Sequence, residues 1–301
     1  MSAAIDHASV RTDVPLAPLT TYKVGGNARW FIEPDDLEEL RSVLLAKPDD
    51  VDLMVLGRGS NVVVSDEGFD GLVVKLGSRF AAIEAKPDGR IVAGGGTPLP
   101  VLARTAADAG RSGLGFFVGI PGSVGGAVRM NAGGHGSDTA SVLSTAVVLD
   151  AATVELSTRP VGLLDLTYRS SNLSESDIVV QATFHTERGT QRELQNELRE
   201  ITRWRKENQP GGTLNAGSVF KNPNDAPAGA IIDDLGLKGE SLGPVSVSMI
   251  HANFLVAEPQ ANAADIHRFV HTIRKTVYEA TGRLLEPEIR FVGNFNDLDP
   301  T

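Results

Sequence analysis

The side chains best suited to act on a small molecule lie together in one short segment. It reads Asn215-Ala-Gly-Ser218-Val-Phe-Lys221-Asn222-Pro223, so a hydroxyl, an ammonium and a carboxamide follow a turn of small residues, and Phe220 offers an apolar wall. A hydroxyl can donate a proton, and an ammonium or a carboxamide can bind a polar ligand. A capped loop would contain the same residues, so this segment alone does not establish an enzyme.

Two further segments carry groups of a similar kind. Tyr168-Arg169-Ser170-Ser171 is by default a polar loop, and Glu286-Pro-Glu288-Ile-Arg290 is ordinarily the start of a strand with a surface ion pair. Neither segment justifies an enzymatic function separately.

Glycine accounts for 32 of the 301 residues, and a first glycine-rich loop follows a predicted strand. It reads Leu56-Gly57-Arg-Gly59-Ser60-Asn61, but Val62 stands where a dinucleotide fingerprint needs its third glycine, and strand residues follow instead of a helix. Its glycines still let backbone N–H groups approach an anion closely. The alternative is a tight turn between two strands.

A second glycine loop, Gly119-Ile-Pro-Gly-Ser-Val-Gly-Gly126, has a different character. Its Ile120 and Val124 favour burial, whereas its glycines leave N–H groups uncovered. Buried amides need an acceptor, which is either a pyrophosphate or a neighbouring strand. Two such loops favour a phosphate-bearing cofactor.

Metal and thiol chemistry are not expected. The chain has no cysteine, which removes disulfides, thiolate metal sites and thiol nucleophiles. His267 and His271 have a spacing that can bind a metal, but no third ligand is evident, and Asp233-Asp234 fits a solvated turn better. The chain also lacks the Gly-x-Ser-x-Gly elbow of a serine hydrolase.

Charge and hydropathy narrow the choice of partners. The formal net charge of −10 makes nucleic acid and anionic membranes poor candidates, because an acidic surface repels phosphate backbones. No stretch approaches the length of a membrane span, and residues 1–14 contain no apolar run of signal-peptide length. We expect a cytoplasmic protein with no obligate protein partner.

A mixed α+β scaffold must position these loops. Capping residues and apolar periodicity predict helices that begin after Asp36, Thr97 and Asn262, and a long helix from about Gln191 to Lys206. Runs of β-branched residues predict strands at 53–56, 62–64, 72–76, 91–93, 145–149, 177–184 and 288–292. The segment 113–134 shows no period and predicts a buried loop system. The change from strands to helix near Gly189 predicts domains at 21–188 and 189–301.

Taken together and in order, the motifs resemble those of the UDP-N-acetylenolpyruvoylglucosamine reductase family. The matching pieces extend from about residue 18 to residue 293. They are Thr20-Thr-Tyr-Lys-Val-Gly-Gly26, Leu56-Gly-Arg-Gly-Ser-Asn61, Gly119-Ile-Pro-Gly-Ser-Val-Gly-Gly126, Asn131-Ala-Gly133, Tyr168-Arg-Ser170, Ala216-Gly-Ser-Val-Phe-Lys-Asn-Pro223, His251-Ala-Asn253 and Leu285-Glu-Pro-Glu-Ile-Arg290. The length is similar to that of the shorter of the family's two forms.

The resemblance implies an α+β fold. An FAD-binding domain of the vanillyl-alcohol-oxidase (PCMH) type, in two subdomains, would be followed by a smaller α+β C-terminal substrate domain. FAD would be bound noncovalently by residues 21–188, with the two glycine loops around its pyrophosphate. The residues implied in cofactor binding are Gly57, Gly59, Ser60, Asn61, Gly119, Ile120, Pro121, Gly122, Ser123, Gly125, Gly126 and Asn131.

The resemblance also implies a reaction. NADPH would reduce the flavin, and flavin N5 would then pass a hydride to the enolpyruvyl group of UDP-N-acetylglucosamine enolpyruvate, giving UDP-N-acetylmuramate for peptidoglycan. Arg169 would stabilise the developing negative charge, Glu288 would assist it in a protonated form with a raised pKa, and Ser218 would donate the proton. The residues implied in substrate binding are Tyr168, Lys221, Asn222 and Arg290.

Three positions depart from the family pattern, and two other functions stay open. The departures are Gly134-His135 in place of a small residue and a tyrosine, Met249-Ile250 in place of a basic residue, and Asn208 in place of a lysine. A flavin-dependent oxidase or hydroxy-acid dehydrogenase would use the same type of cofactor domain. A noncatalytic protein that binds a flavin or a nucleotide sugar is the third class.

Overall fold

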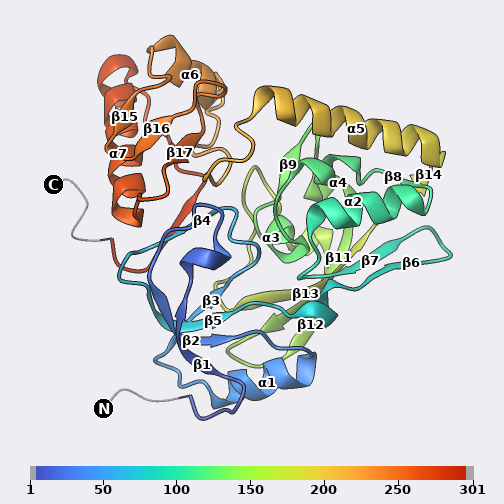
Figure 1. Ribbon diagram of the computed structural model, residues 1–301. Coiled ribbons are helices and arrows are strands. Elements are labelled where there is room, and N and C mark those ends of the chain that lie inside the picture. The colour runs from blue at the N-terminus through green and yellow to red at the C-terminus, as the bar shows by residue number, and fades with distance from the viewer. Residues whose placement is uncertain (1–4, 296–301) are drawn as a thin grey trace. The chain divides into compact units, whose positions relative to one another are not determined.

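Residues 5–295, which the computed structural model describes, divide into two compact units, each assembled from separate parts of the chain (Figure 1). Unit 1 comprises residues up to Thr12, Trp30–Arg58 and Gly71–Trp204; unit 2 comprises Asp13–Arg29, Gly59–Asp70 and the residues from Arg205 onward. The predicted mixture of helices and strands is confirmed. The domain limits 21–188 and 189–301 stay a prediction, because compactness does not say which residues bind a ligand.

An antiparallel five-stranded sheet forms the centre of unit 1 (Figure 1). In sheet order its strands are β12 (Leu156–Pro160), β11 (Leu143–Asp150), β13 (Asp177–Phe184), β7 (Ile91–Gly94) and β6 (Ile83–Ala85). The helices whose side chains share its main core are α2 (Leu99–Asp108), α3 (Val124–Arg129), α4 (Thr139–Val142) and α5 (Gln191–Asn208). Phe117 and Phe184 meet edge to face in this core, with ring centroids 5.7 Å apart.

A second core in unit 1 forms around helix α1 (Leu37–Ala46). Asp36 caps this helix as predicted, since its carboxylate accepts the Glu39 N–H at 3.0 Å. The adjoining sheet has the order β1 (Arg11–Pro15), β2 (Asn27–Ile32), β5 (Phe69–Val74) and β3 (Asp52–Val55), and β3 and β5 are parallel. Strand β13 serves both cores, because Ile178 packs in this one and Phe184 in the other.

Shorter elements complete unit 1. The strands are β8 (Arg111–Ser112), β9 (Gly133–Gly134), β10 (Ser137–Asp138) and β14 (Glu187–Arg188), and the 3-10 helices are Ser78–Ala81, Gly115–Gly119 and Val161–Leu163. Two predictions in this region are wrong. Pro98, not Thr97, is the N-cap of α2, and the predicted loop system contains helix α3.

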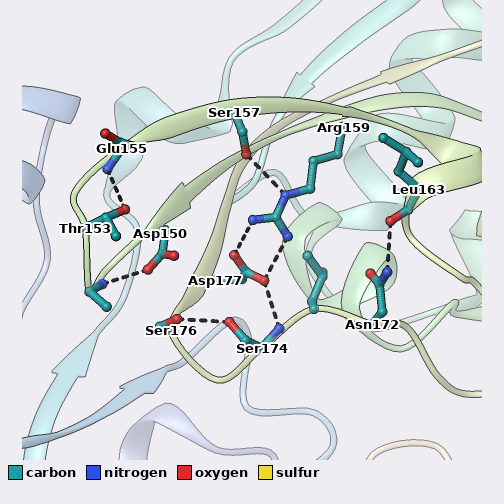
Figure 2. Close-up of polar contacts among 12 residues, drawn as sticks. Asp150, Thr153, Glu155, Ser157, Arg159, Leu163, Asn172, Ser174, Ser176 and Asp177 are labelled. Carbon is teal, nitrogen blue, oxygen red and sulfur yellow. Dashed lines mark hydrogen bonds and ion pairs between the residues drawn. The ribbon is translucent and has the colours of Figure 1, made fainter.

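An ion pair connects β12 to β13, the two strands on either side of β11 in the large sheet. Figure 2 shows Arg159 on β12 donating to both carboxylate oxygens of Asp177 on β13, at 2.9 and 2.7 Å. The Ser174 N–H donates to the same carboxylate at 2.8 Å. Burial alone would raise the pKa of Asp177, but the hydrogen bonds from Arg159 and from Ser174 lower it further than burial raises it, so the pKa lies below its usual value.

We expect Asp177→Asn to lower the free energy of unfolding by about 2 kcal/mol at pH 7, because it removes charged hydrogen bonds from a carboxylate that is only 4% exposed. A carboxyl whose pKa is lowered by folding stabilises the protein above its unfolded pKa, and that stability is lost as the pH falls through the folded pKa. The difference between wild type and variant should therefore shrink below about pH 4 in urea unfolding. Asp70→Asn is the control, since its pair with Arg29 is exposed. A difference that does not change with pH would contradict this account.

Unit 2 is built around helix α7 (Ala263–Thr281) (Figure 1). As predicted, Asn262 and Asp265 form a capping box at its start, and Gly282 ends it in the left-handed region with φ +72°. The other elements are helix α6 (Ala228–Asp234), the antiparallel sheet β15 (Ser241–Leu242), β16 (Val245–Val247) and β17 (Leu255–Ala257), the parallel pair β4 (Val62–Val64) and β18 (Arg290–Val292), and a 3-10 helix, Ala17–Leu19.

The core of unit 2 joins residues that are far apart in the sequence. Tyr22, Val24 and Val63 pack with apolar side chains from residues 216–289. The Tyr22 hydroxyl donates to the Leu255 carbonyl at 3.1 Å, and burial raises the pKa of this phenol well above its usual value. No helix within residues 5–295 combines the length and the apolarity that a bilayer span requires.

Candidate active site

The second glycine loop leads directly into helix α3. The Ser123 hydroxyl caps the helix by accepting the Gly126 N–H at 3.4 Å, and Val124, Ala127 and Val128 bury one face at helical spacing. The Val124 N–H donates to the Thr97 carbonyl at 2.9 Å and the Gly125 N–H to the Gly95 carbonyl at 2.8 Å. For these two amides, the neighbouring backbone is thus the acceptor.

Two other amides of this loop have no acceptor in the part of the chain that the structure describes. Among residues 5–295, no atom accepts a hydrogen bond from the N–H of Gly122 or of Ser123. The first glycine loop approaches the second here, because a Cβ added at Gly57 would lie 2.6 Å from the Ser123 Oγ. Only glycine allows this approach. The N–H groups of Gly57 and Arg58 likewise donate to no other described atom.

The Asn131 side chain makes three hydrogen bonds within the protein. Its side-chain Nδ2 donates to Asp138 Oδ2 at 3.1 Å and to the Thr167 carbonyl at 3.0 Å, and its Oδ1 accepts the Ala140 N–H at 2.8 Å. The residue is 3% exposed. Its contact with a cofactor stays a prediction, and its side chain holds the segment before Tyr168.

Tyr168 and Arg169 form the tip of a tight turn in unit 1. Thr167 and Ser170 exchange backbone hydrogen bonds of 3.1 and 3.2 Å across it. Arg169 has φ +55°, a left-handed conformation that is unfavourable for a long side chain. Its guanidinium donates to the Gly133 carbonyl at 3.2 Å and lies 5.2 Å from the centroid of the Tyr168 ring. The turn therefore holds a cationic group at the cost of backbone strain.

The rest of the first glycine loop, Gly59 to Asn61, lies in unit 2. Gly59 has φ +60°, and a Cβ there would lie 2.3 Å from the Leu19 carbonyl oxygen. The Thr21 N–H donates to the Gly59 carbonyl at 3.0 Å, which gives the Thr20-Thr21-Tyr22 motif a role in supporting this loop. The N–H groups of residues 59–61 donate to no other atom among residues 5–295.

Asn61 joins this loop to the predicted catalytic glutamate. Its side-chain Nδ2 donates to the Glu288 carbonyl at 3.0 Å, and its own carbonyl accepts the Arg290 N–H at 2.9 Å. The amide side chain thus uses one of its two N–H donors within the protein, and the backbone N–H of Asn61 donates to no other described atom. Arg290 is exposed at the start of β18.

Backbone hydrogen bonds join the segment that contains Ser218 to the segment that contains Glu288. The Glu288 N–H donates to the Val219 carbonyl at 2.7 Å, and the Lys221 N–H donates to the Glu286 carbonyl at 2.8 Å. These antiparallel contacts place Ser218 next to the residue that binds Glu288. Within residues 5–295 the Ser218 hydroxyl makes no hydrogen bond, which suits a group that must reach a ligand.

Lys221 and Asn222 each have a structural contact in addition to their predicted role. The Lys221 ammonium pairs with Glu286 at 2.6 Å, and the Asn222 Oδ1 accepts the Ala228 N–H at 2.9 Å at the start of α6. Their contact with substrate stays a prediction. The sequence motifs also gave no role to Asn253, which binds the backbone on both sides of Phe220.

The positions that depart from the family pattern take defined places. The His135 ring meets Trp204 edge to face at 5.0 Å in unit 1, and Asn208 is the last residue of α5. Met249 and Ile250 are 70% and 53% exposed.

His267 and His271 pack together with Phe291 and Phe295. Residues 5–295 contain no group of three His, Asp or Glu side chains arranged to hold a metal ion.

Comparisons with known proteins identify the family. Residues 28–156 match the model of an FAD binding domain, and residues 209–292 match that of the UDP-N-acetylenolpyruvoylglucosamine reductase C-terminal domain. The UDP-N-acetylenolpyruvoylglucosamine reductase of Synechococcus sp. (strain JA-3-3Ab) is 40% identical, with 96% of this chain and 93% of that protein covered. The enzyme of that name from Erythrobacter litoralis is 40% identical, with 93% and 86% covered.

A solved structure agrees with these matches. The crystal structure of UDP-N-acetylenolpyruvylglucosamine reductase from Thermus caldophilus superposes with a TM-score of 0.81 at 34% identity, covering 94% of this chain and all of that one. The predicted fold, an FAD-binding domain followed by the C-terminal domain of the family, is confirmed. The chain therefore belongs to the UDP-N-acetylenolpyruvoylglucosamine reductase family.

Proposed function

We propose that this protein reduces UDP-N-acetylglucosamine enolpyruvate to UDP-N-acetylmuramate with NADPH and FAD, in the synthesis of peptidoglycan precursors. The observation that carries the proposal is the pairing of the Ser218 segment with Glu288 in a chain of this family. We further propose that the reaction takes place in the cytoplasm and that the nucleotide sugar and NADPH are the small-molecule partners.

The two glycine loops fit the diphosphate of FAD. The amides of Gly57, Arg58, Gly122 and Ser123 in unit 1 donate to no atom among residues 5–295, and phosphate oxygens need such donors. Gly57 leaves room for the Ser123 hydroxyl, because a Cβ at position 57 would lie 2.6 Å from the Ser123 Oγ. Bound FAD would supply the hydride transfer from NADPH to the terminal carbon of the enolpyruvyl group.

The residues of this chain would complete the reduction. Hydride addition leaves negative charge on the neighbouring carbon and its carboxylate, and the planar guanidinium of Arg169 matches a carboxylate. Glu288 assists in its protonated form, since a carboxylate would repel the charge that develops. The Ser218 hydroxyl donates its proton to the carbon beside the carboxylate, which completes addition of a hydride and a proton across the double bond.

We expect Glu288→Gln to lose less activity than Glu288→Ala. The amide of glutamine keeps a hydrogen-bond donor where the protonated carboxyl has one, whereas alanine has none. Steady-state kcat should fall by about 10-fold for glutamine and about 100-fold or more for alanine. A larger loss for glutamine than for alanine would reject the protonated form of Glu288.

The function is tested first by the visible spectrum of the purified protein and then by NADPH oxidation. A flavin spectrum with NADPH oxidation that depends on added UDP-N-acetylglucosamine enolpyruvate supports the proposal. A yellow protein without that dependence would indicate a noncatalytic flavin-binding protein. Flavin that stays with the protein after acid precipitation would indicate an oxidase with covalently attached cofactor.

A further inference from the structure

Asn253 is a buried polar residue that makes hydrogen bonds with the backbone of the two residues after Ser218. Its side-chain Nδ2 donates to the Phe220 carbonyl at 2.8 Å, and its Oδ1 accepts the Phe220 N–H at 2.9 Å. Its own backbone carbonyl accepts the Val219 N–H at 2.8 Å. Three hydrogen bonds from one residue that is 3% exposed therefore hold Val219 and Phe220.

Val219 also makes a backbone hydrogen bond to Glu288, through its carbonyl group. The Val219 N–H is bound by Asn253, and the Val219 carbonyl accepts the Glu288 N–H at 2.7 Å. Val219 thus links Asn253 on one side to Glu288 on the other. A displacement of Val219 would move Ser218, its neighbour in the chain, relative to Glu288.

The choice of an amide side chain follows from these contacts. Phe220 presents one donor and one acceptor, and both are buried, so each costs free energy if it is left without a partner. An amide supplies one acceptor and one donor at once, which neither an apolar residue nor a carboxylate can do. Asn253 is itself fixed, because its N–H donates to His251 Nδ1 at 3.2 Å.

We propose that Asn253 is a positioning residue for the proton donor: through Val219 and Phe220 it fixes the Ser218 hydroxyl relative to Glu288. This inference rests on the proposed function and goes beyond it, because Asn253 acts through backbone that it holds and need not touch substrate. Displacement of a reacting group by about 1 Å can cost about 100-fold in rate. The step that needs Ser218 should therefore be the step that is sensitive to Asn253.

The test separates the two half-reactions in the holoenzyme of Asn253→Ala. Oxidation of the prereduced enzyme by UDP-N-acetylglucosamine enolpyruvate should slow by about 100-fold, with affinity for the sugar nucleotide changed less than 3-fold. Flavin reduction by NADPH should stay within about 2-fold of wild type, because that step does not use Ser218. Equal slowing of both steps, or no slowing of sugar-dependent oxidation, would overturn the inference.

A second variant keeps the test decisive if the alanine variant does not fold. In Asn253→Asp the protonated carboxyl still accepts from and donates to Phe220, whereas the carboxylate only accepts. Sugar-dependent oxidation should therefore recover as the pH is lowered, relative to wild type and to the NADPH step at the same pH. A ratio of the two steps that does not vary with pH counts against the proposal.

A matched control separates positioning from stability. Asp66 accepts the N–H groups of Ala263 and Ala264 at 2.8 and 2.9 Å at the start of α7, so Asp66→Ala also removes two side-chain-to-backbone hydrogen bonds from unit 2. It should lower the melting temperature and leave the ratio of the half-reactions unchanged. If the wild-type enzyme shows no sugar-dependent oxidation, the proposed function has failed. If the wild type is active but Asn253→Ala, like Asp66→Ala, leaves the ratio of the half-reactions unchanged, the positioning role has failed.

Discussion

Ser218→Ala should slow oxidation of the prereduced enzyme by UDP-N-acetylglucosamine enolpyruvate by about 1,000-fold or more, with NADPH-driven flavin reduction nearly intact. Proton donation by a positioned side chain contributes up to about 10,000-fold in rate. Alanine removes the only donor atom of this side chain and leaves the backbone contacts of Val219 in place. Stopped-flow absorbance of the flavin measures each step separately.

A serine variant elsewhere in unit 2 provides the control. The Ser65 hydroxyl donates to the Asn294 carbonyl at 2.7 Å and is remote in sequence from the Ser218 segment, so Ser65→Ala should change stability without a change in either half-reaction. Equal damage to both half-reactions in Ser218→Ala would contradict the role of Ser218 as proton donor.

Arg169→Asn should lower sugar-dependent oxidation by about 100- to 1,000-fold without lowering the free energy of unfolding. The activity falls because a preorganised cation that stabilises developing negative charge is lost. Stability is kept because Arg169 has φ +55°, where asparagine is tolerated better than a long side chain, and the relief of strain is worth up to about 1 kcal/mol. Urea unfolding and stopped-flow kinetics on one preparation measure both quantities.

Arg169→Lys distinguishes charge from strain. Lysine keeps the positive charge and the unfavourable backbone conformation but lacks the planar fork that fits a carboxylate. It should retain more activity than asparagine and show no gain in stability. Loss of more than about 1 kcal/mol of stability in Arg169→Asn would show that the arginine serves the fold rather than the reaction.

Elements with strong local signals were predicted well. Asn262 with Asp265 and Asp36 before Leu37 marked two helix starts that the structure confirms, because a cap satisfies nearby amides and needs no distant partner. Helix α3 was missed because Gly125 and Gly126 interrupt its apolar pattern and have low helix propensity. Ser123 and the burial of Val124 compensate for this, and burial depends on the tertiary fold.

The candidate site was predicted as a set of residues but not as a geometry. The motif resemblance selected Ser218 and Glu288, whose segments are joined by backbone hydrogen bonds in unit 2, while their catalytic roles stay a prediction. The bond from Asn61 to the Glu288 carbonyl joins residues 227 positions apart, and no local pattern reports such a contact. The same holds for Asn253, whose amide could be recognised as important only when its bonds to Phe220 were seen.

Because each unit is assembled from separate segments of the chain, unit 2 cannot complete its core until synthesis is nearly finished. Tyr22, Val24 and Val63 leave the ribosome early, yet the apolar residues that cover them follow residue 215. During synthesis these apolar side chains stay exposed until the last third of the protein has emerged from the ribosome. Exposed apolar surface of this kind binds chaperones or aggregates with other chains. A protein truncated after residue 204 would therefore contain Tyr22, Val24 and Val63 but lack the apolar residues that cover them.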